Sequence, residues 1–239
     1  MALRFNRGFS FPIQVISFDL DDTLYFNEEV IKKAERHQFD TVCSLVPAAK
    51  EHGIEFWLRL KWQIAKQQPE LRHDVTEWRK AVIKSGLSHF GLTGAELSAG
   101  INLVYNEFYA ARSNFEVPQQ SFGVLSKLSK KYPLVAVTNG NADIERLGLS
   151  QYFVGYYRAG ENNTRSKPHP DLLELAAKQL DVPLQHILHI GDNPETDVKA
   201  AINAGCQSLW FNTKPSIPYS GQILADGEYS NLDDLLHLL

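Results

Sequence analysis

One stretch near the N-terminus constrains the fold most: an apolar segment that ends abruptly in carboxylates. Residues 13–18 are mostly apolar, and Asp19, Asp21 and Asp22 follow at once. Such a run predicts a strand buried on both faces, as in a parallel sheet. Several charges at the end of a buried strand are costly unless a cation binds there. The stretch therefore indicates a Mg²⁺ site at a strand's carboxyl end or, equally well, a solvated turn after an edge strand.

Beyond residue 114, apolar strands alternate with helical segments. Four further strands are predicted, over 133–137, around 156–157, over 186–190 and over 207–211. Helices are predicted over 119–131, 143–149, 171–180, 196–203 and 233–239. Alternation of this kind is typical of right-handed βαβ units, which form a parallel sheet with helices on both faces. The predicted fold class is α/β, with a Rossmann-like parallel sheet as its core.

A helical insert separates the first strand from the second. Its four amphipathic segments are predicted over 28–46, 54–67, 76–89 and 95–112. Four such helices with no strand between them indicate a small bundle. We expect this bundle to lie as a cap over the end of the first strand. The predicted core domain comprises residues 1–25 and 115–239, and the predicted cap domain comprises residues 26–114.

Composition excludes several classes of protein. The 239 residues carry a net charge of −4 and no basic block, which argues against nucleic-acid binding. No apolar run approaches the length of a membrane span. Two cysteines, Cys43 and Cys206, are too few for a disulfide framework and favour a reducing, cytoplasmic setting. Pro12 interrupts the weakly signal-like N-terminal segment, so we expect a mature N-terminus.

Polar residues follow three of the predicted strands at the point where each ends. They are Asp19 with Asp21, Thr138 with Asn139, and Asp192 with Asp197. The carboxyl ends of parallel strands share one edge, so these residues are expected to lie together. Lys167 precedes a helix in the same half of the chain. Alone, Lys167 would be an ordinary surface lysine and Asp197 an acid in a helix's first turn. Together they describe a site for a phosphate and Mg²⁺.

These residues resemble, in order, the four motifs of the haloacid dehalogenase-like hydrolase superfamily. The matching stretches are Asp19-Leu20-Asp21-Asp22-Thr23, Thr138, Lys167-Pro168, and Gly191-Asp192 with Asp197. The helical insert resembles that superfamily's first type of cap. Further stretches resemble its subgroup of bacterial flavin-pathway phosphatases, which act on 5-amino-6-(5-phospho-D-ribitylamino)uracil and on flavin mononucleotide. Those stretches are 73–79, 117–120, 138–142 and 158–160.

The resemblance implies a role for each acid. Asp19 would be the nucleophile that forms an aspartyl-phosphate, and Asp21 would be the general acid and base. Asp19, the backbone carbonyl of Asp21 and Asp192 would hold Mg²⁺, with Asp197 a more remote or water-mediated ligand. Asp22 has no implied catalytic role and is interpreted as structural.

The resemblance also implies which residues bind the substrate. Thr138 and Asn139 would grip the phosphoryl group, and Lys167 would offset its charge. The segment Asp19-Leu20-Asp21 would complete the phosphate site. Trp78, or Tyr25, could stack on an aromatic substrate, although these aromatic side chains could equally be packing residues.

The predicted activity is Mg²⁺-dependent phosphomonoester hydrolysis, most specifically on the flavin-pathway substrates in riboflavin biosynthesis. The alternatives are a phosphatase of another small metabolite, such as a sugar phosphate or nucleotide, a mutase, a metal-independent 2-haloacid dehalogenase, or a non-catalytic binding protein. Asp21 and Asp192 argue against the dehalogenase. A simple Rossmann nucleotide binder is excluded because no G-x-G-x-x-G turn follows the first strand.

Overall fold

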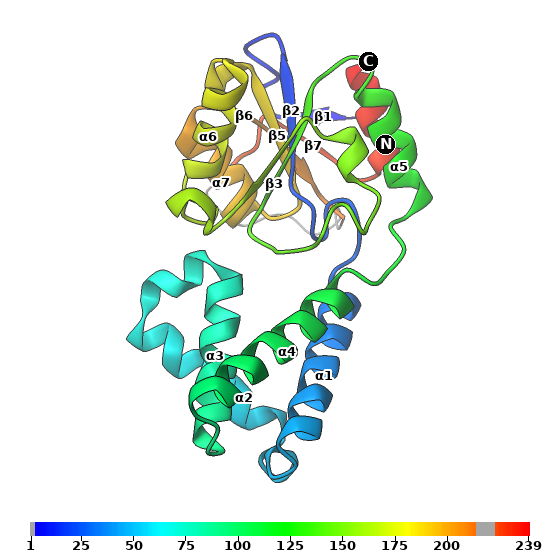
Figure 1. Cartoon of the computed structure of the whole chain (residues 1–239). Helices are drawn as coiled ribbons and strands as arrows, with labels where there is room; N and C mark the ends of the chain where they lie inside the picture. The colour runs from blue at the N-terminus through cyan, green and yellow to red at the C-terminus, as the bar shows by residue number, and fades with distance from the viewer. Residues whose placement is uncertain (1–2, 214–222) are drawn as a thin grey trace.

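A mostly parallel sheet and a bundle of helices form two lobes (Figure 1). The computed structural model describes residues 3–213 and 223–239. Within them, seven strands pair in the order β1-β7-β6-β5-β2-β3-β4, and only β1 and β7 pair antiparallel. The strands are β1 Arg4–Phe5, β2 Val15–Phe18, β3 Leu134–Thr138, β4 Gly155–Arg158, β5 Ile187–Gly191, β6 Gln207–Phe211 and β7 Gly227–Tyr229. The predicted α/β class with a parallel sheet is confirmed.

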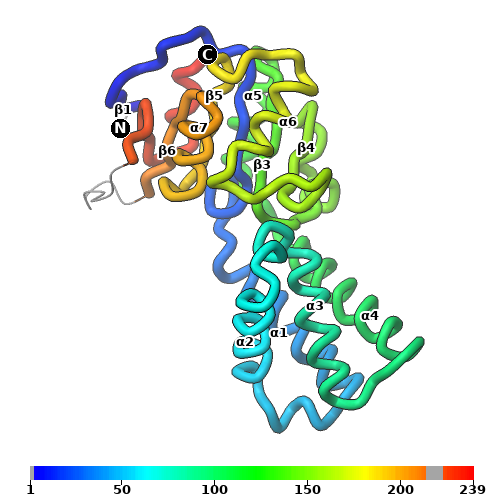
Figure 2. The backbone as a smooth tube through the Cα atoms, turned by 90° about the vertical axis from the view of Figure 1, so that its left-hand side faces the viewer, coloured from blue at the N-terminus to red at the C-terminus, as the bar shows by residue number. Residues whose placement is uncertain are grey.

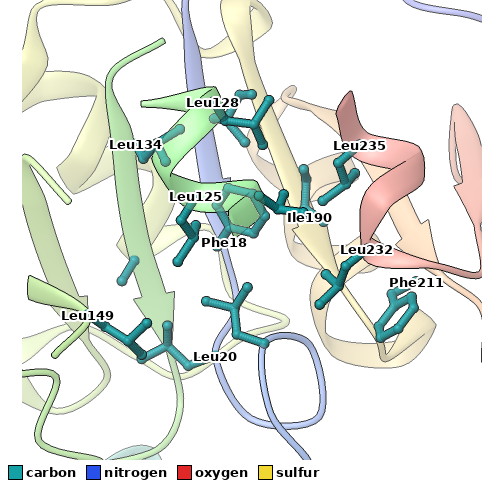
Figure 3. Close-up of a cluster of buried hydrophobic side chains, with 14 of the residues drawn as sticks. Phe18, Leu20, Leu125, Leu128, Leu134, Leu149, Ile190, Phe211, Leu232 and Leu235 are labelled. Atoms are coloured by element: carbon teal, nitrogen blue, oxygen red, sulfur yellow. The ribbon is translucent and has the colours of Figure 1, made fainter. Parts of the chain in front are cut away.

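Strand β2 is central because it lies between β3 and β5 and all four of its residues are buried. Its side chains alternate between the two faces of the sheet. Ile16 and Phe18 pack with α5 (Gln119–Leu128) and η6 (Leu232–Leu238), in the cluster drawn in Figure 3. Val15 packs on the other face with α6 (Asp171–Leu180) and α7 (Lys199–Ala204). Helices therefore cover both faces, and the carboxyl end of β2 remains open for a site.

The helices of this lobe follow the predicted alternation with some differences. They are α5 Gln119–Leu128, α6 Asp171–Leu180 and α7 Lys199–Ala204, with a π-helical turn, η5, over Pro194–Val198. Short 3₁₀ segments are η2 Ser150–Tyr152, η3 Glu161–Asn163, η4 Leu184–His186 and η6 Leu232–Leu238. The helix predicted over 233–239 is thus η6, and that over 196–203 begins as η5.

The helix predicted over 143–149 is wrong, because these residues form turns. Asp143 Oδ1 accepts hydrogen bonds from the backbone amides of Glu145 and Arg146, both at 3.1 Å. Gly148 then adopts a φ of +69°, which ends any helical path. Local side-chain bonding and one left-handed glycine outweigh the apolar spacing that suggested a helix. The short strands β1 and β7 at one side of the sheet were not predicted, since they are too short to show a periodic pattern.

Four longer helices make up the second lobe. They are α1 Glu28–Leu45, α2 Ala49–Gln67, α3 Val75–His89 and α4 Gly94–Arg112, with the 3₁₀ segment η1 Pro69–His73 between α2 and α3. Gly53, with a φ of +63°, interrupts α2, so its regular part begins where the sequence predicted. The helices enclose their own apolar cluster, which includes Val42, Trp57 and Ile83. We call residues 26–114 the cap and the remaining described residues the core.

Two segments connect the cap to the core, one before α1 and one after α4 (Figure 1). In Figure 2, η1 and the start of α3 are the part of the cap that reaches toward the core. Among the described helices, none is both long enough and apolar enough to cross a membrane.

Candidate active site

Polar side chains from four core segments surround one cavity of about 180 Å³ at the carboxyl ends of β2, β3 and β5. The residues that line it are Asp19, Asp21, Asp22, Thr138, Asn139, Gly140, Lys167, Asp192, Asn193, Thr196 and Asp197. The fold thus brings together the acids, the threonine, the asparagine and the lysine that the sequence singled out. The side chain of Leu20 points into the core cluster and is fully buried (Figure 3), so it does not line the cavity.

Asp19 lies directly after β2, and its carboxylate is the buried centre of the site. Its side-chain Oδ1 accepts a hydrogen bond of 2.7 Å from Lys167 Nζ. The Thr23 hydroxyl lies 3.5 Å from Asp19 Oδ2 and 3.4 Å from Asp192 Oδ1, so it bridges two carboxylates. Burial raises the pKa of Asp19 well above its ordinary value, and Lys167 only partly opposes this rise. Asp19 therefore favours a nearby cation beyond Lys167.

Lys167 is held rigidly although it belongs to a loop. Asn139 clamps its backbone: the Lys167 amide donates to Asn139 Oδ1 at 2.8 Å, and Asn139 Nδ2 donates to the Lys167 carbonyl at 3.0 Å. The ammonium group donates to the Val137 carbonyl at 2.8 Å and lies 2.6 Å from Asp197 Oδ1. Burial alone would lower the pKa of Lys167, but Asp19 and Asp197 raise it. Lys167 is therefore charged.

The turn after β5 supplies the other two acids. The backbone amide of Asn193 donates to Asp197 Oδ2 at 3.0 Å, which folds the π-helical turn η5 back toward the strand. A Cβ on Gly191 would lie 2.3 Å from Asp197 Cγ, so only glycine fits there. Burial would raise the pKa of Asp197, but Lys167 and His189 together outweigh burial and lower that pKa. Burial, followed by the charge of Asp197, raises the pKa of Asp192 to about 7.

The donor set fits a hard divalent cation. Asp19, Asp192 and Asp197 each offer one carboxylate oxygen, and the three oxygens lie within 4.8 Å of one another. Lys167 compensates one of these three charges, which leaves an excess of negative charge in a largely buried cluster. Oxygen ligands and uncompensated charge are what Mg²⁺ requires. The raised pKa values of Asp19 and Asp192 reflect the same excess of negative charge.

Asp21 is positioned by a residue that sequence reasoning missed. Arg112 Nη2 donates to Asp21 Oδ1 at 2.5 Å, although 91 positions separate the two residues. On its other side the Asp21 carboxylate lies against the loop after β3, where a Cβ on Gly140 would come within 2.6 Å of Oδ2. No local pattern could have indicated the Arg112 pair, since it depends on how the cap joins the core.

Thr138 and Asp22 shape the loops beside these acids. Thr138 ends β3 and is buried, and its Oγ1 accepts a 2.9 Å hydrogen bond from the Gly140 amide. That bond holds the loop that follows β3 against the cavity. Asp22 has a φ of +59° and accepts a 2.8 Å bond from the Asn27 amide. Asp22 therefore shapes the loop after Asp21 and leads the chain into α1.

A buried pair beneath the site was also missed. Ser17 on β2 and His189 on β5 are register partners, with Ser17 Oγ and His189 Nδ1 2.9 Å apart. His189 Nε2 lies 3.5 Å from Asp197 Oδ1. Burial lowers the pKa of His189, so the ring is neutral and supports Asp197 from below. A histidine inside an apolar strand pattern was the available signal.

The cap touches the core along η1 and the start of α3. His73 Nδ1 lies 2.9 Å from Ser166 Oγ, next to Lys167. Asn141 Nδ2 donates to Thr76 Oγ1 at 3.3 Å. Asp74 packs so closely on Gly160 that a Cβ there would meet its carboxylate carbon at 2.4 Å.

Trp78 is the predicted site residue that the structure does not bring to the active-site cavity. It lines a separate cavity of about 110 Å³ inside the cap, together with Trp57 and Lys61. Its Nε1 donates to the Lys61 carbonyl at 3.2 Å, and its ring packs on the cap's apolar cluster. Tyr25 is likewise buried, with its ring 4.8 Å from that of Phe115.

Comparisons with known proteins extend over almost the whole chain. It is 41% identical over 240 residues to the 5-amino-6-(5-phospho-D-ribitylamino)uracil phosphatase YigB of Escherichia coli (strain K12), covering 99% of this chain and 100% of that protein. It is 26% identical over 217 residues to a glyceraldehyde 3-phosphate phosphatase of Pyrococcus abyssi, covering 83% of this chain and 81% of that protein.

A solved structure agrees with the fold of both lobes. The crystal structure of 2-haloacid dehalogenase from Pseudomonas syringae pv. Tomato DC3000 superposes with a TM-score of 0.86 at 27% identity, covering 95% of this chain and 97% of that one. A family model for haloacid dehalogenase-like hydrolases matches residues 13–205, which include every acid of the site. The sheet topology, the family model and the 41% identical relative agree, and the chain belongs to the haloacid dehalogenase-like hydrolases.

Proposed function

We propose that this hydrolase is a Mg²⁺-dependent phosphomonoesterase that works through an aspartyl-phosphate on Asp19. The observation that carries the proposal is the convergence of three carboxylates, one buried lysine and the Thr138 loop on a single cavity. Negative charge in excess of Lys167 favours a metal, and the remaining polar groups suit a phosphoryl group. The curated relatives named above are phosphatases, which supports the same class of reaction.

In the first step a carboxylate oxygen of Asp19 attacks phosphorus, and the bond from phosphorus to the ester oxygen breaks. Asp21, in its protonated form, gives its proton to that leaving oxygen. Lys167 and the Thr138 loop offset the charge on the phosphoryl oxygens. Lys167 is suited to this task because it is charged, buried and held at both its backbone and its ammonium group.

In the second step water attacks the phosphorus of the aspartyl-phosphate, and Asp21 accepts a proton from that water. The bond from phosphorus to Asp19 breaks, and inorganic phosphate leaves. Asp19, Asp192 and the backbone carbonyl of Asp21 would hold Mg²⁺, with Asp197 anchoring Lys167 and serving as a more remote ligand. When bound, Mg²⁺ neutralises charge and orients the phosphate oxygens.

We further propose that the substrate is 5-amino-6-(5-phospho-D-ribitylamino)uracil, flavin mononucleotide, or both. The 41% identical relative carries the first of these substrates in its name. The stretches that resemble the flavin-pathway subgroup also meet in space: Asp74 packs on Gly160, and Thr76 bonds with Asn141. A subgroup-specific junction between cap and core is where a substrate's leaving group would be selected. The small cysteine count, with Cys43 and Cys206 both free, supports a reducing, cytoplasmic setting.

A screen of phosphate esters with and without Mg²⁺, scored by kcat/KM, tests the proposal. Hydrolysis should require the metal, and dialysis against a chelator should abolish it. The two flavin-pathway phosphates should exceed sugar phosphates and nucleotides in kcat/KM. Full turnover in metal-free buffer would reject the Mg²⁺ requirement, and preference for a sugar phosphate would reject only the substrate.

The name of the structural neighbour makes dehalogenation the second activity to test. The carboxylates Asp21 and Asp192 argue against it, because that chemistry in this superfamily needs neither an acid at position 21 nor a metal. Release of halide from a 2-haloacid in metal-free buffer, without phosphatase activity, would favour the dehalogenase.

A further inference from the structure

The cap contributes a buried cation to the core's predicted acid and base. Arg112 lies in the last turn of α4 and is only 1% exposed. Its Nη2 donates to Asp21 Oδ1, and the two groups form an ion pair across the junction of the lobes. Figure 1 shows this end of α4 where the cap joins the core. A buried guanidinium needs an anionic partner, so this contact fixes where Arg112 and Asp21 lie.

Both connecting segments meet at this ion pair. Asp21 forms a β-bridge with Tyr25, whose buried hydroxyl lies beside Asp21 and Arg112. The Tyr25 ring packs against Phe115 of the second segment at 4.8 Å. The Ser121 hydroxyl of α5 donates to the Leu24 carbonyl at 2.5 Å and ties the first segment to the core. A shift of the cap would therefore move the groups that surround Asp21.

The carboxylate of Asp21 is confined on the opposite side as well. The Gly140 backbone leaves no room there even for a Cβ, which would come within 2.6 Å of Asp21 Oδ2. Arg112 on one side and the Gly140 loop on the other thus restrict the rotamer of Asp21. Proton transfer depends on such geometry, because the acid must reach the leaving oxygen within hydrogen-bond distance.

We propose that Arg112 is a positioning residue, which orients the Asp21 carboxyl group toward the leaving oxygen and makes that orientation depend on the placement of the cap. The inference rests on the proposed phosphatase reaction and adds a residue of the cap to it. Arg112 touches Asp21 and acts through it, so its loss should affect most the substrates that depend most on proton donation.

Arg112→Met and Arg112→Lys test the inference on two small esters at saturating Mg²⁺. p-Nitrophenyl phosphate has a good leaving group that needs little protonation, whereas glycerol phosphate has an alkoxide leaving group that needs a proton. In Arg112→Met, kcat/KM for glycerol phosphate should fall roughly ten-fold more than for p-nitrophenyl phosphate, which is a part of the ~10²–10⁴-fold that a well-placed general acid contributes. Arg112→Lys, which keeps a charged donor, should recover part of that difference. Equal losses on the two esters would overturn the inference.

Arg79→Met is the matched control, because Arg79 is another largely buried arginine of the cap. Its guanidinium bonds to Gln38 and Glu35 of α1 and lies 3.6 Å above the Phe108 ring, with no partner in the core among the described contacts. Its loss should lower kcat/KM equally for both esters, and an ester-selective loss would also overturn the inference.

If Arg112→Met does not fold, judged by circular dichroism, Arg112→Lys alone decides, since its weaker donor should still give a selective loss on glycerol phosphate.

Two outcomes separate this inference from the proposed function. If the unmodified protein hydrolyses neither these two esters nor the flavin-pathway phosphates with Mg²⁺, the proposed function fails and this inference with it. If the unmodified protein hydrolyses both and the variants lose activity equally, only the inference fails.

Discussion

The core and the cap bury charge in different ways. At the sheet edge of the core, Asp19, Lys167 and Asp197 are 7%, 3% and 2% exposed, and the acids outnumber the lysine. In the cap, the buried cluster is apolar, and Arg79 finds its partners on α1 of the same bundle. Excess buried charge lowers stability. Its presence in the core therefore indicates a role in binding and catalysis and not in folding. Among the described contacts, the buried guanidinium of Arg112 instead crosses to Asp21 in the core, and weaker polar contacts such as His73 with Ser166 join the two lobes elsewhere.

The largest expected effect follows from removing the nucleophile in the core. Asp19→Asn should abolish phosphoenzyme formation and lower kcat by ~10⁴-fold or more, since an amide does not attack phosphorus. Rapid quench with a radiolabelled phosphate ester measures the phosphoenzyme. In metal-free buffer, the free energy of unfolding of Asp19→Asn should be at least as large as that of the unmodified protein, because the variant carries one uncompensated carboxylate charge fewer. Phosphate trapped on a residue other than Asp19 would reject the assignment.

Asp21→Asn should have a smaller and different effect, which separates the acid and base from the nucleophile. With p-nitrophenyl phosphate, some phosphoenzyme should still form because the leaving group needs little protonation. Its hydrolysis should slow by ~10²-fold or more, since no carboxylate activates water. The phosphoenzyme should therefore accumulate in rapid-quench experiments. Absence of any phosphoenzyme in Asp21→Asn, despite a folded protein, would contradict these separate roles.

Lys167→Met tests how much the buried charge of the core affects the free energy of unfolding. Leaving Asp19 and Asp197 without their buried cation should lower the free energy of unfolding by about 3 kcal/mol in metal-free buffer. Saturating Mg²⁺ should restore part of this loss, because a ligand of the native state stabilises it. Thermal unfolding with and without Mg²⁺ measures both changes. Lys131→Met is the control and should cost much less, because the Lys131 ammonium donates to the backbone oxygens of Leu238 and Leu239 and has no carboxylate side chain among its described partners.

The core site was predictable from the sequence to a greater degree than the cap. Strands that are apolar throughout must be buried and parallel, so the polar residues after them, such as Asp19, Thr138 and Asp192, had to share one edge. Four ordered motifs then indicated the family. The turns at 143–149 were not predicted, because one Asp side chain and one left-handed glycine override the apolar spacing.

In the cap, periodicity shows which face of a helix is apolar but not what covers it. Trp78 lies on such a face, where it packs against α2 and lines the cavity inside the cap instead of the active-site cavity. The pair of Arg112 with Asp21 was equally hidden, because it depends on the path of two connecting segments. Contacts between lobes, far apart in sequence, are the part that a single sequence does not indicate.

The smallest expected effect distinguishes the interior of the cap from the face that touches the core. Trp78→Ala should lower the free energy of unfolding by about 2 kcal/mol, less than for a fully buried tryptophan, because the side chain is only partly buried. Its effect on kcat/KM should be the same, within a factor of about two, for flavin mononucleotide and for acetyl phosphate. A ring that stacked on the substrate would instead raise kcat/KM roughly ten-fold or more for flavin mononucleotide alone, by analogy with base stacking on aromatic side chains.

His73→Ala is the comparison variant, because His73 contacts Ser166 beside Lys167. Its loss should weaken the contact between cap and core by about 1 kcal/mol. A flavin-selective loss in Trp78→Ala would mean that the cap moves far enough to bring its interior to the substrate, and the division between a self-contained cap and a catalytic core would then fail.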